Sequence, residues 1–361
     1  MPQIPRPGVS IHKKSKTFKG FTLFAPIRGN RAYLIDMKGE VVHKWKLDKK
    51  SEGGAINHAM LLPGGHLFID QEAPGKPPVA AGHGGRLREY DWDGKIVWDH
   101  IDRHQHHDAR KLPNGNAIYL AWEIVPKKIH KRIKGGLPGT EGHGGHIYGD
   151  VVREVNRAGE TVWEWRCWEH MTPENHPIMG LYSREEFAHA NTLCPLPNGD
   201  LLIGFRIINT IVIVDKKTKK VKWSHRDDLW GGQHDPQLLD NGNILLFANG
   251  NFIPEPQQSW PFSRVIELNP KTKKTVWSWQ APSPLEFNSP HISGVQRLPN
   301  GNTLVCEGGY GRLFEVTQKG EMVWEYASPF YLAHPKLGQT NWIFRCKRYA
   351  ADAPELAGRL K

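Results

Sequence analysis

The sequence predicts an all-β protein, a six-bladed β-propeller with four-stranded blades around a central channel. Two repeated markers along the 361 residues lead to this prediction. One is a turn of the type Leu-Pro-Asn-Gly, or a close variant, at 62–66, 112–116, 196–200, 239–243 and 298–302. The other is a short apolar segment that ends in an aromatic residue. β-units that each carry a turn and an aromatic residue are typical of propellers.

Each turn is expected to join the two inner strands of one blade. Asn-Gly between apolar segments is a strong hairpin signal, because both residues tolerate the positive φ of a tight turn. The aromatic markers are expected to close each blade on its outer side and to pack against the next blade. They fall at Trp45, Trp98, Trp163, Trp223, Trp277 and Trp324.

There are six aromatic markers but only five inner turns, so the first blade lacks an inner strand. The segment 341–350 is the expected donor of that strand, which would close the ring and remove its open edges. We therefore expect an N-terminal extension at 1–20, the propeller at 21–350 and a C-terminal tail at 351–361. The insertion 166–188 is expected to be partly helical near 183–187, and the Gly-His-Gly-Gly segments at 82–85 and 142–145 are expected to be surface loops.

Composition limits the partners and the location. A net charge of +11 favours anionic partners, but no nucleic-acid-binding signature is present, so a small anionic or phenolic substrate is the expected partner. No apolar run is long enough to span a membrane, and no apolar segment follows the basic N-terminus as in a signal peptide. Four scattered cysteines predict free thiols. These features predict a cytoplasmic protein, and they leave its oligomeric state open.

Histidines recur at the starts of the predicted inner strands. His107 and His234 lie five residues before the leucine of the turn, and His189 and His291 lie seven before it. Because odd offsets share one face of a strand, these four side chains are expected to converge on the channel. His58 lies four residues before its leucine, so it is out of phase unless a β-bulge intervenes.

Other polar residues are expected near these histidines. Arg206 ends an apolar strand, where a guanidinium is costly unless it meets an anion. Asn191 lies two residues after His189 and is expected on the same face. Asn249 matches Arg206 in the next blade, and comparable places in two further blades hold Glu123 and Glu307. We expect His291, Asn249, Glu123 and Glu307 to bind substrate.

Several readings of the histidines remain open. Convergent imidazoles can serve as nucleophile and anion-stabilising donors in group transfer, without a cofactor. Alternatively, they can bind one transition-metal ion in a lyase or oxidoreductase. The ligands would then be His107, His189, His234, His291 and His58. Repeated histidines can also be structural, as in a non-enzymatic interaction scaffold.

Four segments, at 106–116, 188–206, 232–250 and 296–326, resemble the bacterial aryl sulfotransferase family. Members of that family are six-bladed propeller enzymes that work without nucleotide-activated sulfate. The resemblance implies ping-pong transfer of a sulfuryl group from one phenol to another through a sulfohistidine. It places the nucleophile at His234 and its catalytic neighbours at His107, His189, Asn191 and Arg206. The sequence departs from the best-known members in its short N-terminal part and in the additional His291.

Overall fold

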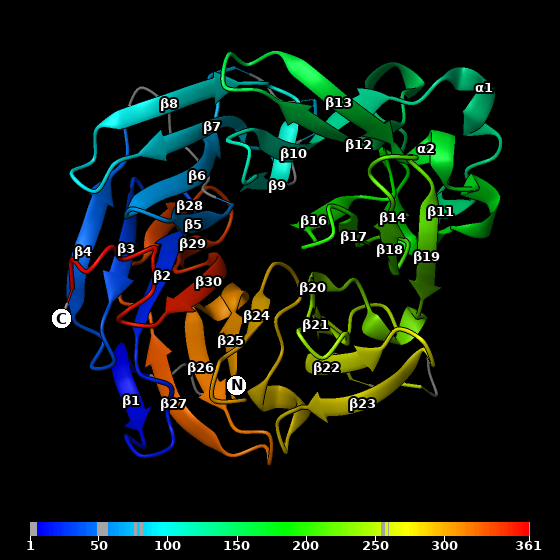
Figure 1. Cartoon of the computed structure of the whole chain (residues 1–361). Coiled ribbons are helices and arrows are strands. Elements are labelled where there is room, and N and C mark those ends of the chain that lie inside the picture. The colour runs from blue at the N-terminus through cyan, green and yellow to red at the C-terminus, as the bar shows by residue number, and fades with distance from the viewer. Residues whose placement is uncertain are drawn as a thin grey trace.

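The computed structural model describes residues 6–48, 57–75, 78–79, 82–253, 257–258 and 260–360, and it confirms the predicted fold. Within these residues, six antiparallel sheets surround a central channel as the blades of a propeller (Figure 1). Each blade has four strands, named below from the channel outwards.

The blades follow one another in chain order. Blade 1 consists of β30 (Ile343–Tyr349), β2 (Phe21–Pro26), β3 (Arg31–Ile35) and β4 (Val41–Lys46). Blade 2 consists of β5 (Ala59–Leu62), β6 (His66–Glu72), β7 (Gly85–Tyr90) and β8 (Ile96–Ile101). Blade 3 consists of β9 (Gln105–Lys111), β10 (Ala117–Ile124), β12 (Tyr148–Val155) and β13 (Thr161–Arg166).

The second half of the ring repeats this arrangement. Blade 4 consists of β16 (Ala190–Pro195), β17 (Leu201–Phe205), β18 (Thr210–Val214) and β19 (Val221–Arg226). Blade 5 consists of β20 (His234–Leu238), β21 (Ile244–Ala248), β22 (Arg264–Asn269) and β23 (Lys274–Trp279). Blade 6 consists of β24 (Gly294–Arg297), β25 (Thr303–Glu307), β26 (Arg312–Val316) and β27 (Met322–Ala327).

The two ends of the chain meet at the junction of blades 1 and 6. β30 pairs antiparallel with β2, with Lys347 opposite Leu23, so the predicted closure by the C-terminal strand is confirmed. At the other end, β1 (Gly8–His12) adds a fifth strand to the outer edge of blade 6 by pairing with β27. This strand lies within the segment 1–20, which was expected to be an extension.

The aromatic markers tie neighbouring blades together. In every blade a tryptophan of the outer strand donates its indole N–H to a backbone carbonyl in the next blade, at 2.8–3.1 Å. The donors and acceptors are Trp45 and Asp91, Trp98 and Arg157, Trp163 and Lys216, Trp165 and Lys219, Trp223 and Pro270, Trp277 and Gln318, Trp279 and Gly320, and Trp324 and Met37. These bonds satisfy the polar atom of each indole, buried or half-buried, and link each blade to the next.

Insertions add short elements outside the six sheets. They are α1 (Lys127–His130), α2 (Cys167–His170), β11 (Gly135–Leu137), β14 (Ile178–Ser183), β15 (Glu186–Phe187), β28 (Leu332–His334) and β29 (Gly338–Thr340), with 3-10 turns at His143–Gly145, Pro173–Asn175, Asp228–Trp230, Pro284–Glu286 and Gly308–Tyr310. The helix expected near 183–187 is absent from this described segment. Its backbone pairs with blade 3 instead, through β15 and β12. No helix among the described residues is long and apolar enough to cross a membrane.

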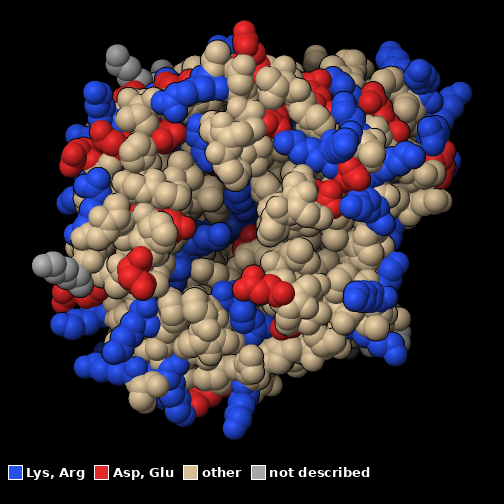
Figure 2. All heavy atoms as spheres, viewed as in Figure 1, with Lys and Arg blue, Asp and Glu red and all other residues tan. Residues whose placement is uncertain are grey.

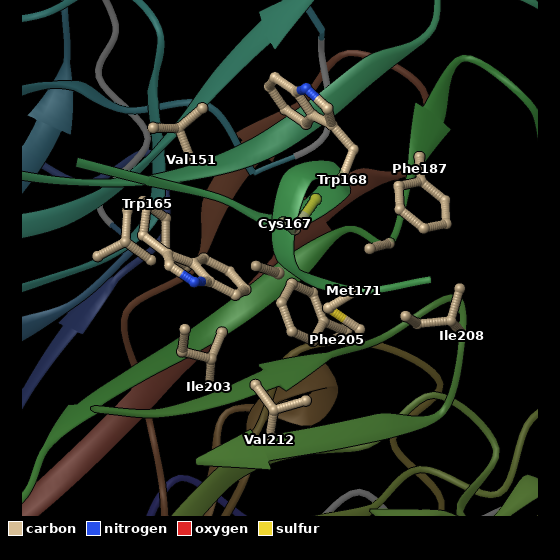
Figure 3. Close-up of a cluster of buried hydrophobic side chains, with 14 of the residues drawn as sticks. Val151, Trp165, Cys167, Trp168, Met171, Phe187, Ile203, Phe205, Ile208 and Val212 are labelled. Carbon is tan, nitrogen blue, oxygen red and sulfur yellow. The ribbon is translucent and has the colours of Figure 1, made fainter. Parts of the chain in front are cut away.

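Apolar side chains fill the spaces between blades. The cluster between blades 3 and 4 is the largest, and α2 covers it with Cys167 and Trp168 (Figure 3). Trp165 and Phe205 face each other there, with ring centroids 6.5 Å apart. Full burial of such side chains contributes about 1.5–3 kcal/mol each. This packing holds the insertion 166–188 against the channel end of blade 4.

A buried ion-pair network fills the middle of the channel. Arg345 of β30 reaches Asp108 of β9 at 2.7 Å and Asp235 of β20 at 3.2 Å. It also donates to the carbonyl oxygen of Asn191 and to the hydroxyl of Thr192 on β16. One side chain of blade 1 therefore links blades 3, 4 and 5. Figure 2 shows that the face in view is hollowed at its centre, and that Lys and Arg side chains gather in the hollow.

Candidate active site

A cavity of about 320 Å³ occupies one end of the channel. Its walls come from the starts of the inner strands, from the loops beside them and from the β28–β29 hairpin. The lining residues are Ile27, Arg28, Asn57, Gly82, His83, His107, His189, Arg206, His234, His291, Ile292, His334, Trp342 and Phe344. The four histidines predicted to converge on the channel are therefore brought together. His58 is absent from the wall, and Asn57 stands there in its place.

The backbone conformation at the starts of the inner strands determines that these side chains point into the cavity. His107 and His189 have φ values of 48° and 54°, in the left-handed region that residues other than glycine and asparagine seldom adopt. The pairing of β16 with β17 shifts register between Ala190 and Thr192. Such strain in a residue at the channel end of a strand is characteristic of functional sites.

His234 has one ring nitrogen fixed by a neighbour. Its Nδ1 lies 2.7 Å from Oδ1 of Asn249. The amide of Asn249 donates in turn to the carbonyl oxygens of Ser289 and Ile292, which orients its oxygen towards the histidine. Nδ1 of His234 is therefore the protonated nitrogen, and Nε2 carries the lone pair. Burial and then the charge of Arg206 hold the pKa of His234 well below its ordinary value, so the imidazole is neutral.

His189 pairs with a carboxylate that the sequence did not single out. Its Nδ1 lies 2.6 Å from Oε2 of Glu186, and the other oxygen of that carboxylate accepts a hydrogen bond of 2.7 Å from the indole of Trp122. Burial opposes ionisation of Glu186, but the charge of His189 and these hydrogen bonds outweigh it and lower its pKa. Glu186 is thus an ionised carboxylate that holds His189 by Nδ1 and turns Nε2 outward.

His107 completes a row of imidazoles. Its ring lies edge-on to that of His189, with centroids 4.5 Å apart. Its Nδ1 is 2.8 Å from Nδ1 of His106, whose ring stacks on Trp122 at 4.2 Å. Burial, followed by the neighbouring histidines, lowers the pKa of His107 well below its ordinary value. His107 is therefore neutral, and the row can donate hydrogen bonds to an anion.

Arg206 faces the cavity from blade 4 without a carboxylate partner. Its guanidinium lies over the ring of Tyr182, 5.0 Å from the centroid. Its Nε and the hydroxyl of Tyr182 are both buried and lack a hydrogen-bond partner among the described residues. Tyr182 belongs to β14, in the insertion 166–188, where no repeat pattern could have marked it. An unsatisfied guanidinium nitrogen on the wall of a basic cavity is suited to an anionic ligand.

The opposite wall is formed by blades 6 and 1. The rings of His291 and Trp342 meet edge-on, with centroids 4.4 Å apart, and His334 of β28 lies 5.0 Å from Trp342. Burial and then the charge of Arg206 lower the pKa of His291 to about 4. Phe344 of β30 forms the floor and touches His107 and His234, each at 6.2 Å between centroids. This wall presents mainly flat apolar surfaces.

Comparison with known proteins identifies the family. The arylsulfotransferase (ASST) family matches residues 104–329, which is more than half of the chain. The chain belongs to this family. Arylsulfate sulfotransferase AssT of Escherichia coli O6:H1 is 22% identical to it over 365 aligned residues, which cover 79% of this chain and 58% of AssT. The chain thus spans less than two thirds of the length of this curated arylsulfotransferase.

Solved structures show the same fold. A protein of unknown function from Bacteroides caccae superposes with a TM-score of 0.57 at 15% identity, over 92% of this chain and 99% of that one. A streptogramin B lyase superposes with a TM-score of 0.52 at 9% identity, over 97% of this chain and 95% of the lyase. Both are similar to this arylsulfotransferase family member in their propeller architecture alone.

Two asparagines expected in the cavity lie behind its wall. Asn191 donates to the backbone carbonyl of Gln233 at 2.7 Å and does not line the cavity. The positive φ of His189 and the register shift after Ala190 interrupt the alternation on which the prediction relied. Asn249 likewise reaches the cavity only through His234. It positions that histidine and is placed to touch no substrate.

The two glutamates expected to bind substrate are committed to arginines outside the cavity. Glu123 pairs with Arg153 and Arg166, both at 2.8 Å. Glu307 pairs with Arg312 at 2.9 Å. Neither glutamate lines the cavity, so the geometry gives no support to the prediction that they bind substrate.

The alternative metal site finds no support in the geometry. Across the described part of the chain, no group of three or more His, Cys, Asp or Glu side chains is arranged to hold a metal ion. The five histidines proposed as ligands do not form such a group. His58 is buried and does not line the cavity wall with the other four. In this family member His107, His189, His234 and His291 instead line a shared cavity of about 320 Å³.

Proposed function

We propose that this arylsulfotransferase family member transfers a sulfuryl group from an aryl sulfate to a phenolic acceptor through an intermediate on His234. The observation that supports the proposal most is the hydrogen bond from Nδ1 of His234 to Asn249. It leaves the lone pair on Nε2 of a neutral imidazole, beside the unpaired guanidinium of Arg206. A neutral nitrogen nucleophile next to a fixed positive charge suits attack on an anionic sulfate ester.

In the first half-reaction, Nε2 of His234 forms a bond to the sulfur of the donor. The bond between sulfur and the phenolic oxygen breaks, and its electron pair leaves with the oxygen. Protonated His189 donates the proton on its Nε2 to that oxygen. Until this transfer, the Glu186 carboxylate stabilises the positive charge of His189. The Nδ1 proton of His234 stays in its hydrogen bond to Asn249 throughout.

In the second half-reaction, a phenolic acceptor takes the place of the first phenol. Its hydroxyl proton moves to Nε2 of His189, and its oxygen forms a bond to sulfur. The nitrogen–sulfur bond breaks, and the electron pair returns to Nε2 of His234. Both reaction halves therefore balance in protons, with no cofactor required under this proposal.

Charge on the sulfuryl oxygens is met by fixed donors. Arg206 and His107 line the cavity and both neighbour His189, through a backbone hydrogen bond of 3.0 Å from Arg206 and a ring contact of 4.5 Å between centroids with His107. In a loose transition state, the bond from sulfur to the leaving oxygen is largely broken before the bond to the incoming group has formed. Negative charge then spreads over the three remaining oxygens of the sulfuryl group, as in phosphoryl transfer. Donors held in place by packing stabilise this charge without having to reorganise. Small anionic aryl esters are the partners that we propose, and the cytoplasmic location stays a prediction.

The test uses 4-nitrophenyl sulfate as donor and phenol as acceptor, with nitrophenolate release as the readout. Replacement of His234 by Ala is expected to lower kcat by on the order of 1000-fold or more, because the nucleophile is lost. The surface variant His176→Ala is the matched control and should retain wild-type activity. Incubation with donor alone should add the mass of one sulfuryl group to the wild-type peptide that contains His234. Full activity of His234→Ala, or activity abolished by a chelator and restored by one metal, would overturn the proposal.

A further inference from the structure

Arg28 is the second guanidinium on the cavity wall, and the proposed reaction does not use it. It lies in the turn between β2 and β3 of blade 1. Its Nη1 atom is buried and has no hydrogen-bond partner among the described residues, and no carboxylate of this part of the chain lies within ion-pair distance of it. A buried guanidinium nitrogen without a partner costs free energy unless a ligand completes it.

The backbone at Arg28 is also unusual. Its φ is 71°, in the left-handed region that disfavours residues with a Cβ atom. The turn is anchored by the hydrogen bond of 2.8 Å from the amide of Ile27 to the carbonyl of Trp342, and by the close approach of Gly29 to the carbonyl of Pro26. The turn therefore holds a strained arginine against the cavity, although a glycine there would relieve the strain.

The place of Arg28 in the ring is opposite to that of Arg206. Arg28 belongs to blade 1 and Arg206 to blade 4, and these two blades face each other across the channel (Figure 1). Phe344 and Trp342 line the same cavity, so its wall offers flat apolar surfaces as well as the two guanidiniums. The cavity volume, at about 320 Å³, is in the lower part of the range for small-molecule sites, so it suits a ligand with one or two rings.

We propose that Arg28 binds a second anionic group of the substrate, on the end of the aromatic body away from the transferred sulfuryl group. The preferred substrates are then phenols and aryl sulfates that carry a ring carboxylate or a comparable anion. This inference rests on the proposed function for the identity of the first anion, which lies at Arg206 and His234. The second anion gives the unsatisfied Nη1 of Arg28 an acceptor and sets the orientation of the ring.

Binding of unreactive sulfonates tests the inference without any turnover. Benzenesulfonate carries one anion, and 4-sulfobenzoate carries a second one at the opposite end of the ring. By titration calorimetry, 4-sulfobenzoate is expected to bind the wild-type protein about tenfold more tightly, the advantage typical of one charge-assisted hydrogen bond. Arg28→Ala is expected to bind both sulfonates with equal Kd. The exposed neighbour Arg31 provides the matched control, and Arg31→Ala should keep the tenfold difference.

Kinetics give the second readout. The ratio of kcat/KM for 4-carboxyphenyl sulfate over 4-nitrophenyl sulfate is expected to fall about tenfold in Arg28→Ala, through KM, and to recover in Arg28→Lys. Equal affinity of the wild-type protein for the two sulfonates would overturn the role of Arg28. Absence of any turnover with a preserved difference in sulfonate affinity would instead contradict the proposed function and leave the two-anion site standing.

Discussion

Nδ1 of His234 and Oδ1 of Asn249 lie 2.7 Å apart, and the amide of Asn249 is locked by two backbone carbonyls. This relationship decides which nitrogen of His234 faces the cavity with a lone pair. Asn249 comes from the end of β21, one strand away from the histidine that it orients. It therefore acts as a positioning residue for the proposed nucleophile.

Replacement of Asn249 by Ala is expected to lower kcat about tenfold, because one hydrogen bond that selects the tautomer is lost. KM should change little, since Asn249 does not line the cavity. Steady-state kinetics with 4-nitrophenyl sulfate measures both constants. A melting curve of the variant separates this effect from unfolding. An unchanged kcat in a folded variant would show that the tautomer is set by another contact.

Replacement of Glu186 by Gln is expected to lower kcat on the order of 100-fold, because His189 loses the charge that supports its protonated form. The amide can still accept a hydrogen bond from His189, so the ring should stay in place. The neighbouring Glu185→Gln makes the same chemical change outside the cavity and should keep wild-type kcat. Equal losses in the two variants would point to a general effect of charge on this segment.

Stability should depend on pH through His291. The pKa of this group is about 4 in the folded chain and about 6.5 in the unfolded chain, so the unfolded state binds the proton first as the pH falls. Its contribution to stability is complete above pH 6.5 and is lost as the pH falls through 4. Relative to His291→Asn, the wild-type protein should lose roughly 3 kcal/mol of unfolding free energy between pH 7 and pH 4. Urea unfolding at several pH values measures the difference, and parallel curves would contradict it.

The ion-pair network in the channel should matter for stability more than for catalysis. Arg345→Met leaves the carboxylates of Asp108 and Asp235 buried without their cation, and it is expected to cost about 3–5 kcal/mol in urea unfolding. The double variant Asp108→Asn with Arg345→Met should be less destabilised than the sum of the two single variants, because the two residues share one interaction. Additive effects would mean that the network is not coupled.

Much of the fold follows from local signals in the sequence. The tryptophans recur in all six units and the inner turns in five of them, so blade number and the missing inner strand could be counted. The spacing from histidine to turn also worked, since it brought His107, His189, His234 and His291 to one cavity and favoured Asn57 over His58. The strand alternation is interrupted in each of these blades, but positive-φ residues recur beside the histidines of the inner strands, so the four side chains still meet.

The rest of the site could not be predicted in this way. Glu186 and Tyr182 come from an insertion without a repeat, and Arg28 comes from a turn that resembles any other surface turn. Asn191 was misplaced because a left-handed residue and a register shift interrupt the alternation of side chains. The positions of these residues depend on how the ring of blades closes in three dimensions, and no single segment of the sequence determines that arrangement.

The closure of the ring by β30 has a consequence for how the protein is made. β30 pairs with β2 near the other end of the chain, so synthesis of blade 1 is complete only when the ribosome has added Tyr349. A nascent chain that ends before Trp342 holds five blades and an open edge at β2, and it lacks Trp342 and Phe344 of the cavity wall. The complete cavity is thus among the last features that the growing chain can form, and a product that stops before β30 is expected to lack the proposed activity.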